Sequence, residues 1–121
     1  TLTSSAQGWL GGAFVFVTCP VIHWHGDLTK NGAQFTNHGI SLTNGSWIYL
    51  SGDITNFARG LTLGLNHYGN STKSDAVIAG TTISDCIDGV YLYRRSTLTN
   101  YSSSYSNNSS NDINSTDGFI N

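Results

Sequence analysis

The sequence contains no glutamate, no methionine and a single proline, and only 10% of its 121 residues are charged. A typical soluble domain has about 25% charged residues, so solubility here must come from Asn, Ser and Thr side chains. Seven aspartates face two lysines and three arginines, for a net charge of −2. This balance offers no basic patch for nucleic acid and no polybasic stretch for an anionic membrane. No apolar run approaches the ~18 residues of a membrane span.

The residue patterns that mark common enzymes are also missing. The sequence has no Gly-x-Ser-x-Gly elbow and no phosphate-binding glycine loop before a helix. Asp85 and Asp88 lie close together, but turn formation accounts for both. A glycosidase-like pair of aspartates remains open, because such a pair is defined by distance in space. We therefore expect a non-enzymatic protein without a cofactor.

The chain has few cysteines, namely Cys19 and Cys86. In an oxidising compartment the two would pair, and closing so long a loop would stabilise the fold by roughly 4 kcal/mol. The alternative is a pair of buried free thiols. We predict a disulfide between an early and a late strand.

What the sequence has in abundance is the Asn-x-Ser/Thr pattern of N-linked glycosylation. Its composition would give about three such acceptors by chance, and it contains twice that number. The acceptors are Asn44, Asn70, Asn100, Asn107, Asn108 and Asn114. N-linked glycans require an exposed position and a secretory route, so the pattern predicts an extracellular or cell-surface protein. Asn44 and Asn70 lie in turn sequences and are the preferred sites, whereas the adjacent Asn107 and Asn108 cannot both carry bulky glycans.

Strand patterns dominate the chain, and no window shows a helical period. Seven or eight short strands at spacings of roughly 8–12 residues favour an antiparallel β-sandwich, immunoglobulin-like or jelly-roll-like. A β-helix is the rival architecture, but no repeat of fixed length is visible. The expected strands are 13–18, 21–25, 39–42, 46–50, 61–65, 76–83 and 90–93.

Two short sequences predict tight turns between these strands. Asn44-Gly45 is typical of a hairpin, and Asp88-Gly89 is expected to form the turn before the last strand. The expected core consists of Phe14, Phe16, Val21, Ile48, Leu50, Leu61, Leu63, Ile78 and Tyr91.

Composition divides the chain into two parts. Residues 1–95 are predicted to form a single β domain that includes an N-terminal strand segment. Residues 96–121 are rich in Ser and Asn and contain four of the acceptors. Such a segment is typical of a glycosylated tail or linker, or of a strand that docks on a neighbouring subunit. The first five residues lack an initiator Met and a signal-peptide core, which favours a processed end or a fragment.

One short motif could bind a metal. In a strand, His23 and His25 of the sequence Ile22-His23-Trp24-His25-Gly26 would point to the same face. This stretch resembles the first copper-binding His-x-His of multicopper oxidases. Those enzymes also need further His-x-His pairs and a cysteine-bearing histidine cluster, and this chain has neither. The resemblance therefore implies at most a simple zinc or copper site, and exposed strand histidines are the alternative.

Aromatic residues suggest carbohydrate as a partner. Trp9, Trp24 and Trp47, together with six tyrosines, could form a sugar-stacking surface, although core positions are more common for such residues in a small β domain. Arg94-Arg95 is interpreted as a solvated strand end.

Taken together, low charge, β structure and many acceptors predict a structural subunit of an extracellular filament that adds strands between its own copies. In composition and layout the chain resembles the secreted donor-strand-exchange fibres of archaea, of the thread and bundling-pilus type. The apolar segments 9–17 and 118–120 are the strands that could insert into a neighbour, and the first offers more apolar area. Deleting residues 1–12 is then expected to prevent polymerisation.

The alternative is a binding module, either a viral or phage receptor-binding head or a carbohydrate-binding β domain. Open head-to-tail contacts would indicate the filament, and closed trimeric symmetry would indicate the head.

Overall fold

The protein is a parallel β-solenoid of about four turns with three sheets, as shown by a computed structural model that describes residues 2–4, 12–32, 38–64 and 72–121. Sheet A contains β1 (Leu2–Ser4), β4 (Leu28–Lys30), β7 (Ile54–Thr55), β10 (Thr82–Ser84) and β13 (Ser104–Ser106). Sheet B contains β2 (Gly12–Val17), β5 (His38–Thr43), β8 (Arg59–Leu63), β11 (Asp88–Leu92) and β14 (Asn111–Ser115). Sheet C contains β3 (Ile22–His25), β6 (Trp47–Ser51), β9 (Asp75–Ala79), β12 (Thr97–Tyr101) and β15 (Phe119–Ile120).

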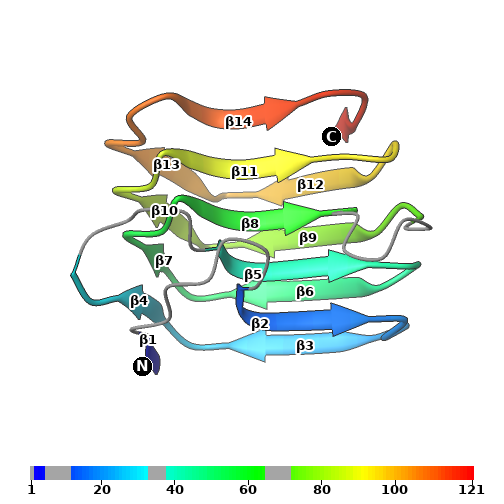
Figure 1. The fold of residues 1–121 in the computed structure, drawn as a ribbon, viewed down its shortest axis with the longest axis horizontal. Coiled ribbons are helices and arrows are strands. Elements are labelled where there is room, and N and C mark those ends of the chain that lie inside the picture. Colours follow the sequence, from blue (N-terminus) through cyan, green and yellow to red (C-terminus); the bar gives the residue numbers. More distant parts are fainter. Residues whose placement is uncertain (1, 5–11, 33–37, 65–71) are drawn as a thin grey trace.

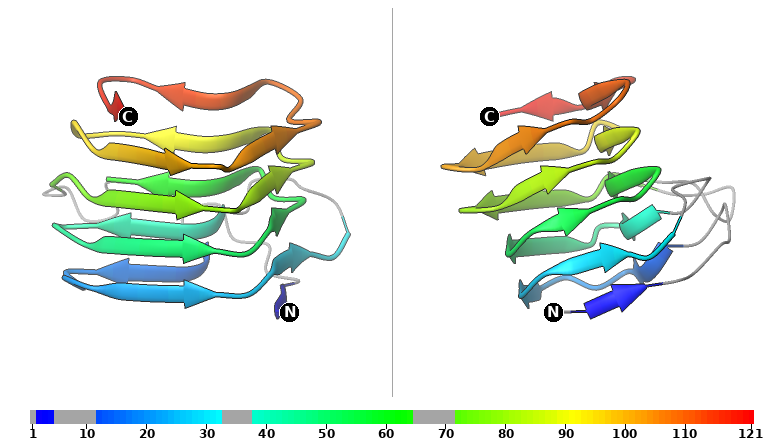
Figure 2. Two further views of the ribbon diagram at one scale, coloured as in Figure 1. Left: turned by 180° about the vertical axis from the view of Figure 1, so that it is seen from behind. Right: turned by 90° about the vertical axis from the view of Figure 1, so that its left-hand side faces the viewer.

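The chain passes from sheet B to sheet C to sheet A in each turn and climbs along one axis (Figure 1). Figure 2 shows the successive turns stacked one above the other when the molecule is seen from behind and from the side. The predicted antiparallel sandwich is therefore wrong, and the rival β-helix describes the fold. Every strand pair in the described residues is parallel, because each strand pairs with its equivalent one turn away.

The core lies inside the solenoid as rows of apolar side chains that run along the axis. Register places the same inward position of successive turns side by side, so like side chains stack on one another. Sheet B contributes the row Phe14, Ile40, Leu61, Val90 and Ile113. Sheet C contributes Ile22, Ile48, Ala76, Leu98 and Ile120. Sheet A contributes Leu28, Ile54, Ile83 and Tyr105.

Most of the expected core is confirmed, with two exceptions. Val21 is 63% exposed, because it lies at the corner before β3. Tyr91 lies on the outer face of sheet B, where the Arg59 guanidinium sits 4.0 Å from its ring centroid. Phe14 and Phe16 are half-buried against the core. The fully buried members of the expected set are Ile48, Leu50, Leu61, Leu63 and Ile78.

A ladder of buried serines holds the corner between sheets B and C, which we call the B–C corner. The Ser46 backbone N–H donates to the Ser74 hydroxyl at 3.2 Å, and the Ser74 N–H donates to the Ser96 hydroxyl at 3.0 Å. All three serines are buried. Each hydroxyl accepts a hydrogen bond from a backbone donor one turn away, which is what a buried N–H requires.

The repeat is hidden because the turns differ in length. At the corner between sheets C and A, the Asp53 N–H donates to Asp27, 26 residues earlier, and the Thr82 N–H donates to Asp53, 29 residues earlier. In the next turn, the Thr81 N–H donates to the hydroxyl of Ser103, only 22 residues later. Extra residues between strands change the period without changing the register of the strands.

Of the two predicted turns, one is present but connects different sheets, and the other is absent. Asn44 and Gly45 form a turn with φ values of 56° and 77°, which confirms the turn. The turn does not make a hairpin, since it leads from β5 in sheet B to β6 in sheet C. Asp88 and Gly89 lie inside β11, so the turn predicted there is wrong.

The change in composition at Ser96 coincides with no break in the sheets. Residues 97–120 provide β12 to β15, which continue all three sheets. At the other end, residues 12–17 form β2, which pairs with β5 of the same chain. Residues 9–11 of the expected donor segment lie outside the described residues.

The predicted disulfide is not formed, and both cysteines are free. Cys19 follows β2 at the B–C corner of the first turn, whereas Cys86 precedes β11 at the corner between sheets A and B of a later turn. Burial raises the pKa of the Cys86 thiol from 9.0 to about 11. Cys86 is therefore a protonated, unreactive thiol at neutral pH.

Candidate functional site

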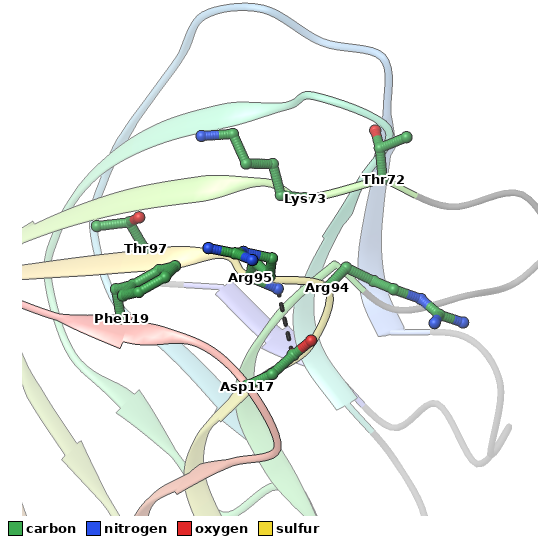
Figure 3. A pocket seen from close by; sticks show the side chains of 7 residues that line it. All are labelled: Thr72, Lys73, Arg94, Arg95, Thr97, Asp117 and Phe119. Carbon is green, nitrogen blue, oxygen red and sulfur yellow. Dashed lines mark hydrogen bonds between the residues drawn. The ribbon is translucent and has the colours of Figure 1, made fainter.

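An open hollow of about 630 Å³ lies at the B–C corner of the last turns. Figure 3 shows its side chains, which come from three consecutive turns of the solenoid. The lining residues are Thr72, Lys73, Arg94, Arg95, Thr97, Asp117 and Phe119. Its volume is in the range of small-molecule pockets, which are about 300–1,000 Å³.

The hollow concentrates positive charge in a protein that has little of it. Lys73, Arg94 and Arg95 are three of the chain's five basic residues. Lys73 pairs with Asp75 at 3.5 Å, and this is the single ion pair in the described part of the chain. Asp117 accepts a hydrogen bond from the backbone N–H of Arg95 at 3.2 Å. In Figure 3 the Arg95 side chain extends toward Thr97 and Phe119, whereas the Arg94 guanidinium extends in the opposite direction; neither has a carboxylate partner among the described residues.

The two arginines occupy a strained backbone. Their φ values are 57° and 60°, in the left-handed region, and the Ser96 N–H closes the turn on the Tyr93 carbonyl at 3.0 Å. Gly and Asn are the residues that such a turn prefers, and a side chain like arginine costs about 1–2 kcal/mol at each position. Left-handed residues other than glycine recur at the corners between strands, for example Thr18 and Asp85, so this strain belongs to the corners of the solenoid.

Phe119 adds an apolar surface to the charged hollow. Its side chain is 48% exposed, and the Arg95 guanidinium lies 5.4 Å from the ring centroid. A cation over a ring face holds both groups in place. The hollow therefore combines fixed cations, hydroxyl groups and an exposed ring.

The metal-ligand candidates His23 and His25 lie elsewhere, on the outer face of sheet C. Both are exposed on β3, and their ring centroids are 6.4 Å apart. His38 belongs to sheet B and is buried. No group of three or more His, Cys, Asp or Glu side chains that could hold a metal ion occurs among the described residues.

The aromatic residues divide between the core and the surface. Trp24 packs against Phe14, with ring centroids 4.7 Å apart, and is a core residue. Trp47 lies half-buried beside His23, with ring centroids 6.1 Å apart. Trp9 lies outside the described residues. The aromatic surface therefore consists of Trp47 and Tyr49 beside the two histidines on sheet C, and it is not a platform of three tryptophans.

The glycan acceptors differ in how their side-chain amides are used. The Asn108 amide nitrogen donates to the Ile83 carbonyl at 3.1 Å and to Asp112 at 3.0 Å. A glycan attached to this nitrogen would remove one of its two donors, whereas the neighbouring Asn107 is exposed. Of this adjacent pair, Asn107 is thus the better acceptor.

The other acceptors are also partly engaged, and their occupancy stays a prediction. Asn44 is half-buried and accepts a hydrogen bond from the Thr72 N–H at 3.2 Å. The amide nitrogen of Asn100 donates to Ser103, and that of Asn114 donates to Asp88. Asn70 lies outside the described residues.

The sequence alone indicates a solvated strand end at Arg94 and Arg95 and does not predict the hollow that they line. Lys73, Asp117 and Phe119 come from other turns, and no local pattern connects them to the arginines. The available signal was a basic residue directly before a ladder serine in two successive turns, Lys73 before Ser74 and Arg95 before Ser96.

Within the described residues, no helix is long and apolar enough to cross a membrane. Comparison of the chain with protein-family models, curated proteins and solved structures finds no match in any of the three.

Proposed function

We propose that this protein is a non-enzymatic, extracellular binding module that holds a carboxylated saccharide in the hollow of Lys73, Arg94 and Arg95. The observation that carries the proposal is that three of the five basic residues line one open hollow, with the Arg95 side chain directed toward the exposed Phe119 ring. Arginine matches the two oxygens of a carboxylate with paired N–H donors. The net charge of −2 makes this local positive charge the place where an anion is attracted.

Two further features favour a saccharide over a simple anion. The exposed ring of Phe119 can pack against the apolar face of a sugar, and the Thr72 and Thr97 hydroxyls can bond to sugar hydroxyls. The six glycan acceptors remain the support for an extracellular location, since the free cysteines provide none.

Calorimetric titration of the protein with a sialylated trisaccharide tests the proposal. The same sugar without its carboxylated residue should not bind. Arg95→Gln should weaken binding about tenfold to a hundredfold, because a hydrogen bond to a charged group contributes about 1.5–3 kcal/mol. Arg59→Gln is the matched control, since it changes the net charge equally but lies on sheet B, where Arg59 donates to Tyr93 at 2.7 Å.

A second variant separates function from strain. Arg94→Asn should weaken binding much less than Arg95→Gln, because the Arg94 guanidinium points away from the other lining side chains. It should raise the free energy of unfolding by up to about 1 kcal/mol, because asparagine tolerates φ near 57°. Equal binding by the Arg59, Arg94 and Arg95 variants, or by the neutral sugar, would contradict the proposed site.

A second candidate function is self-assembly by strand addition at the last turn. β15 pairs with β12, and its residues Phe119 and Ile120 are 48% and 54% exposed. A further strand there could come from residues after Asn121 in a longer chain, or from a second copy. Insertion into a groove of the protein's own sandwich is not available, because the fold is a solenoid.

Sedimentation velocity of the 121-residue chain at high concentration tests this assembly. Ile120→Lys should abolish large species, because a charge in the last inward row opposes stacking of a further turn. Tyr101→Lys, which adds the same charge at an exposed side chain on the wall of sheet C, should leave them unchanged. A monomer at every concentration would exclude the assembly.

A further inference from the structure

Two exposed imidazoles stand side by side on the outer face of sheet C, apart from the cationic hollow. His23 and His25 alternate with Ile22 and Trp24 along β3, so both project outward while the latter two face the core. Their ring centroids are 6.4 Å apart and their planes differ by 23°. Neither ring has a role in the proposed saccharide site.

The structure orients one of these rings for a ligand. The His25 Nδ1 lies 3.1 Å from the hydroxyl oxygen of Ser51, the residue that pairs with His25 one turn later. When Nδ1–H donates to this oxygen, the Nε2 lone pair is free to bind a metal. A hydrogen bond of this kind is the usual way in which proteins fix a metal-binding imidazole.

We propose that His23 and His25 form a two-imidazole site for a divalent transition metal, with Cu²⁺ bound most tightly and water completing the coordination. Metal–imidazole bonds are about 2.0–2.1 Å long, so the exposed His23 ring must rotate out of its near-parallel arrangement with His25 for a nitrogen of each ring to reach one ion. Imidazole pairs favour Cu²⁺ over the other divalent first-row metals. No third His, Cys, Asp or Glu side chain joins the pair among the described residues, so water supplies the other ligands.

The surrounding rings provide a reporter for the bound ion. Trp47 lies 6.1 Å from His23, and Tyr49 lies 6.1 Å and 6.0 Å from His23 and His25, as measured between ring centroids. A paramagnetic ion held by the two imidazoles therefore sits beside an indole. Cu²⁺ should quench the fluorescence of Trp47.

Titration of the protein with Cu²⁺, followed by fluorescence and by electron paramagnetic resonance, tests the site. One equivalent should bind with the nitrogen hyperfine pattern of two imidazoles. His23→Gln and His25→Gln should each lower the affinity about a hundredfold, because a second linked ligand raises affinity by at least that factor. Ser51→Ala should lower it about tenfold by releasing the His25 ring, the effect expected for an outer-shell partner.

Matched controls make the outcome decisive. His67→Gln removes the one histidine outside the described residues, and it should leave the affinity unchanged. Tyr49→Phe keeps the ring next to both imidazoles, and it should do the same. Circular dichroism melting of each variant verifies that the fold is intact, as expected for exposed positions. Unchanged Cu²⁺ affinity in either β3 variant, or equal loss in His67→Gln, would overturn the proposal.

Discussion

Replacing Gly52 by alanine should lower the free energy of unfolding by about 3 kcal/mol or more, the upper range of overpacking in a dense interior. A Cβ at Gly52 would lie 2.1 Å from the carbonyl oxygen of Gly26, one turn earlier. That neighbour is backbone, so it cannot rotate away. The turns would have to separate at this corner, and the β3–β6 pairing that lies next to it would be lost. Chemical denaturation measured by circular dichroism gives the difference.

Gly26→Ala is the matched control for this prediction. Gly26 has a φ of 130°, close to the 124° of Gly52, but a Cβ there would meet nothing within 4 Å. Both variants carry the strain of an unfavourable φ, which costs about 1–3 kcal/mol. Only Gly52→Ala adds the contact between turns. If Gly26→Ala and Gly52→Ala lowered the free energy of unfolding equally, the two turns would not be in close contact at Gly52.

Leu61→Ala should destabilise the protein by about 2–5 kcal/mol, the range for removing a buried leucine from a packed core. Leu61 is fully buried in the middle of its row, between Ile40 and Val90. Truncation leaves a cavity in the central turn that neither neighbour can fill without breaking register. Since each turn contacts only its neighbours, a loosened central turn weakens the coupling between the turns on either side of it. Urea denaturation and hydrogen exchange of the flanking strands would measure the effect.

The neighbouring Thr62 provides the control. It is also fully buried, and its hydroxyl has no hydrogen-bond partner in the described structure. Thr62→Val keeps the shape and removes a buried, unpaired polar group, so it should be neutral or stabilising by about 1 kcal/mol. A loss comparable to that of Leu61→Ala would show that the Thr62 hydroxyl is in fact paired, and that packing alone does not decide stability in this turn.

Local alternation located the strands of sheets B and C up to β11 and much of the core. It missed β1, β4, β7 and β12 to β15, and it merged β9 with β10. Ile48, Leu50 and Leu63 alternate with less apolar residues, and such alternation buries one face whether the strand pairs in parallel or antiparallel fashion. For the same reason, alternation could not distinguish a solenoid from a sandwich. The Asn44-Gly45 turn was equally ambiguous, because the same φ values can close a hairpin or turn the chain into the next sheet.

Register between turns was the missing information. The serine ladder of Ser46, Ser74 and Ser96 repeats one position before a strand of sheet C, so in principle it was visible in the sequence. Turns that differ in length concealed it, because extra residues at the corners shift the spacing without shifting the pairing.

The disulfide prediction failed for a related reason. It expected Cys19 and Cys86 to link an early and a late strand, whereas the solenoid keeps them at different corners of different turns.

The sequence by itself determined the all-β character, the low charge and which residues of a strand share a face, because these follow from residue types and from a period of two along each strand. It also determined that His23 and His25 share one face of a strand. Only the tertiary structure decided that Lys73, Arg95 and Phe119 meet in one hollow. They are 22 and 24 residues apart, about one turn each, and parallel stacking of turns about 4.8 Å apart brings them together. A site built along the axis of a solenoid has no local signature, since each turn contributes only one or two of its residues.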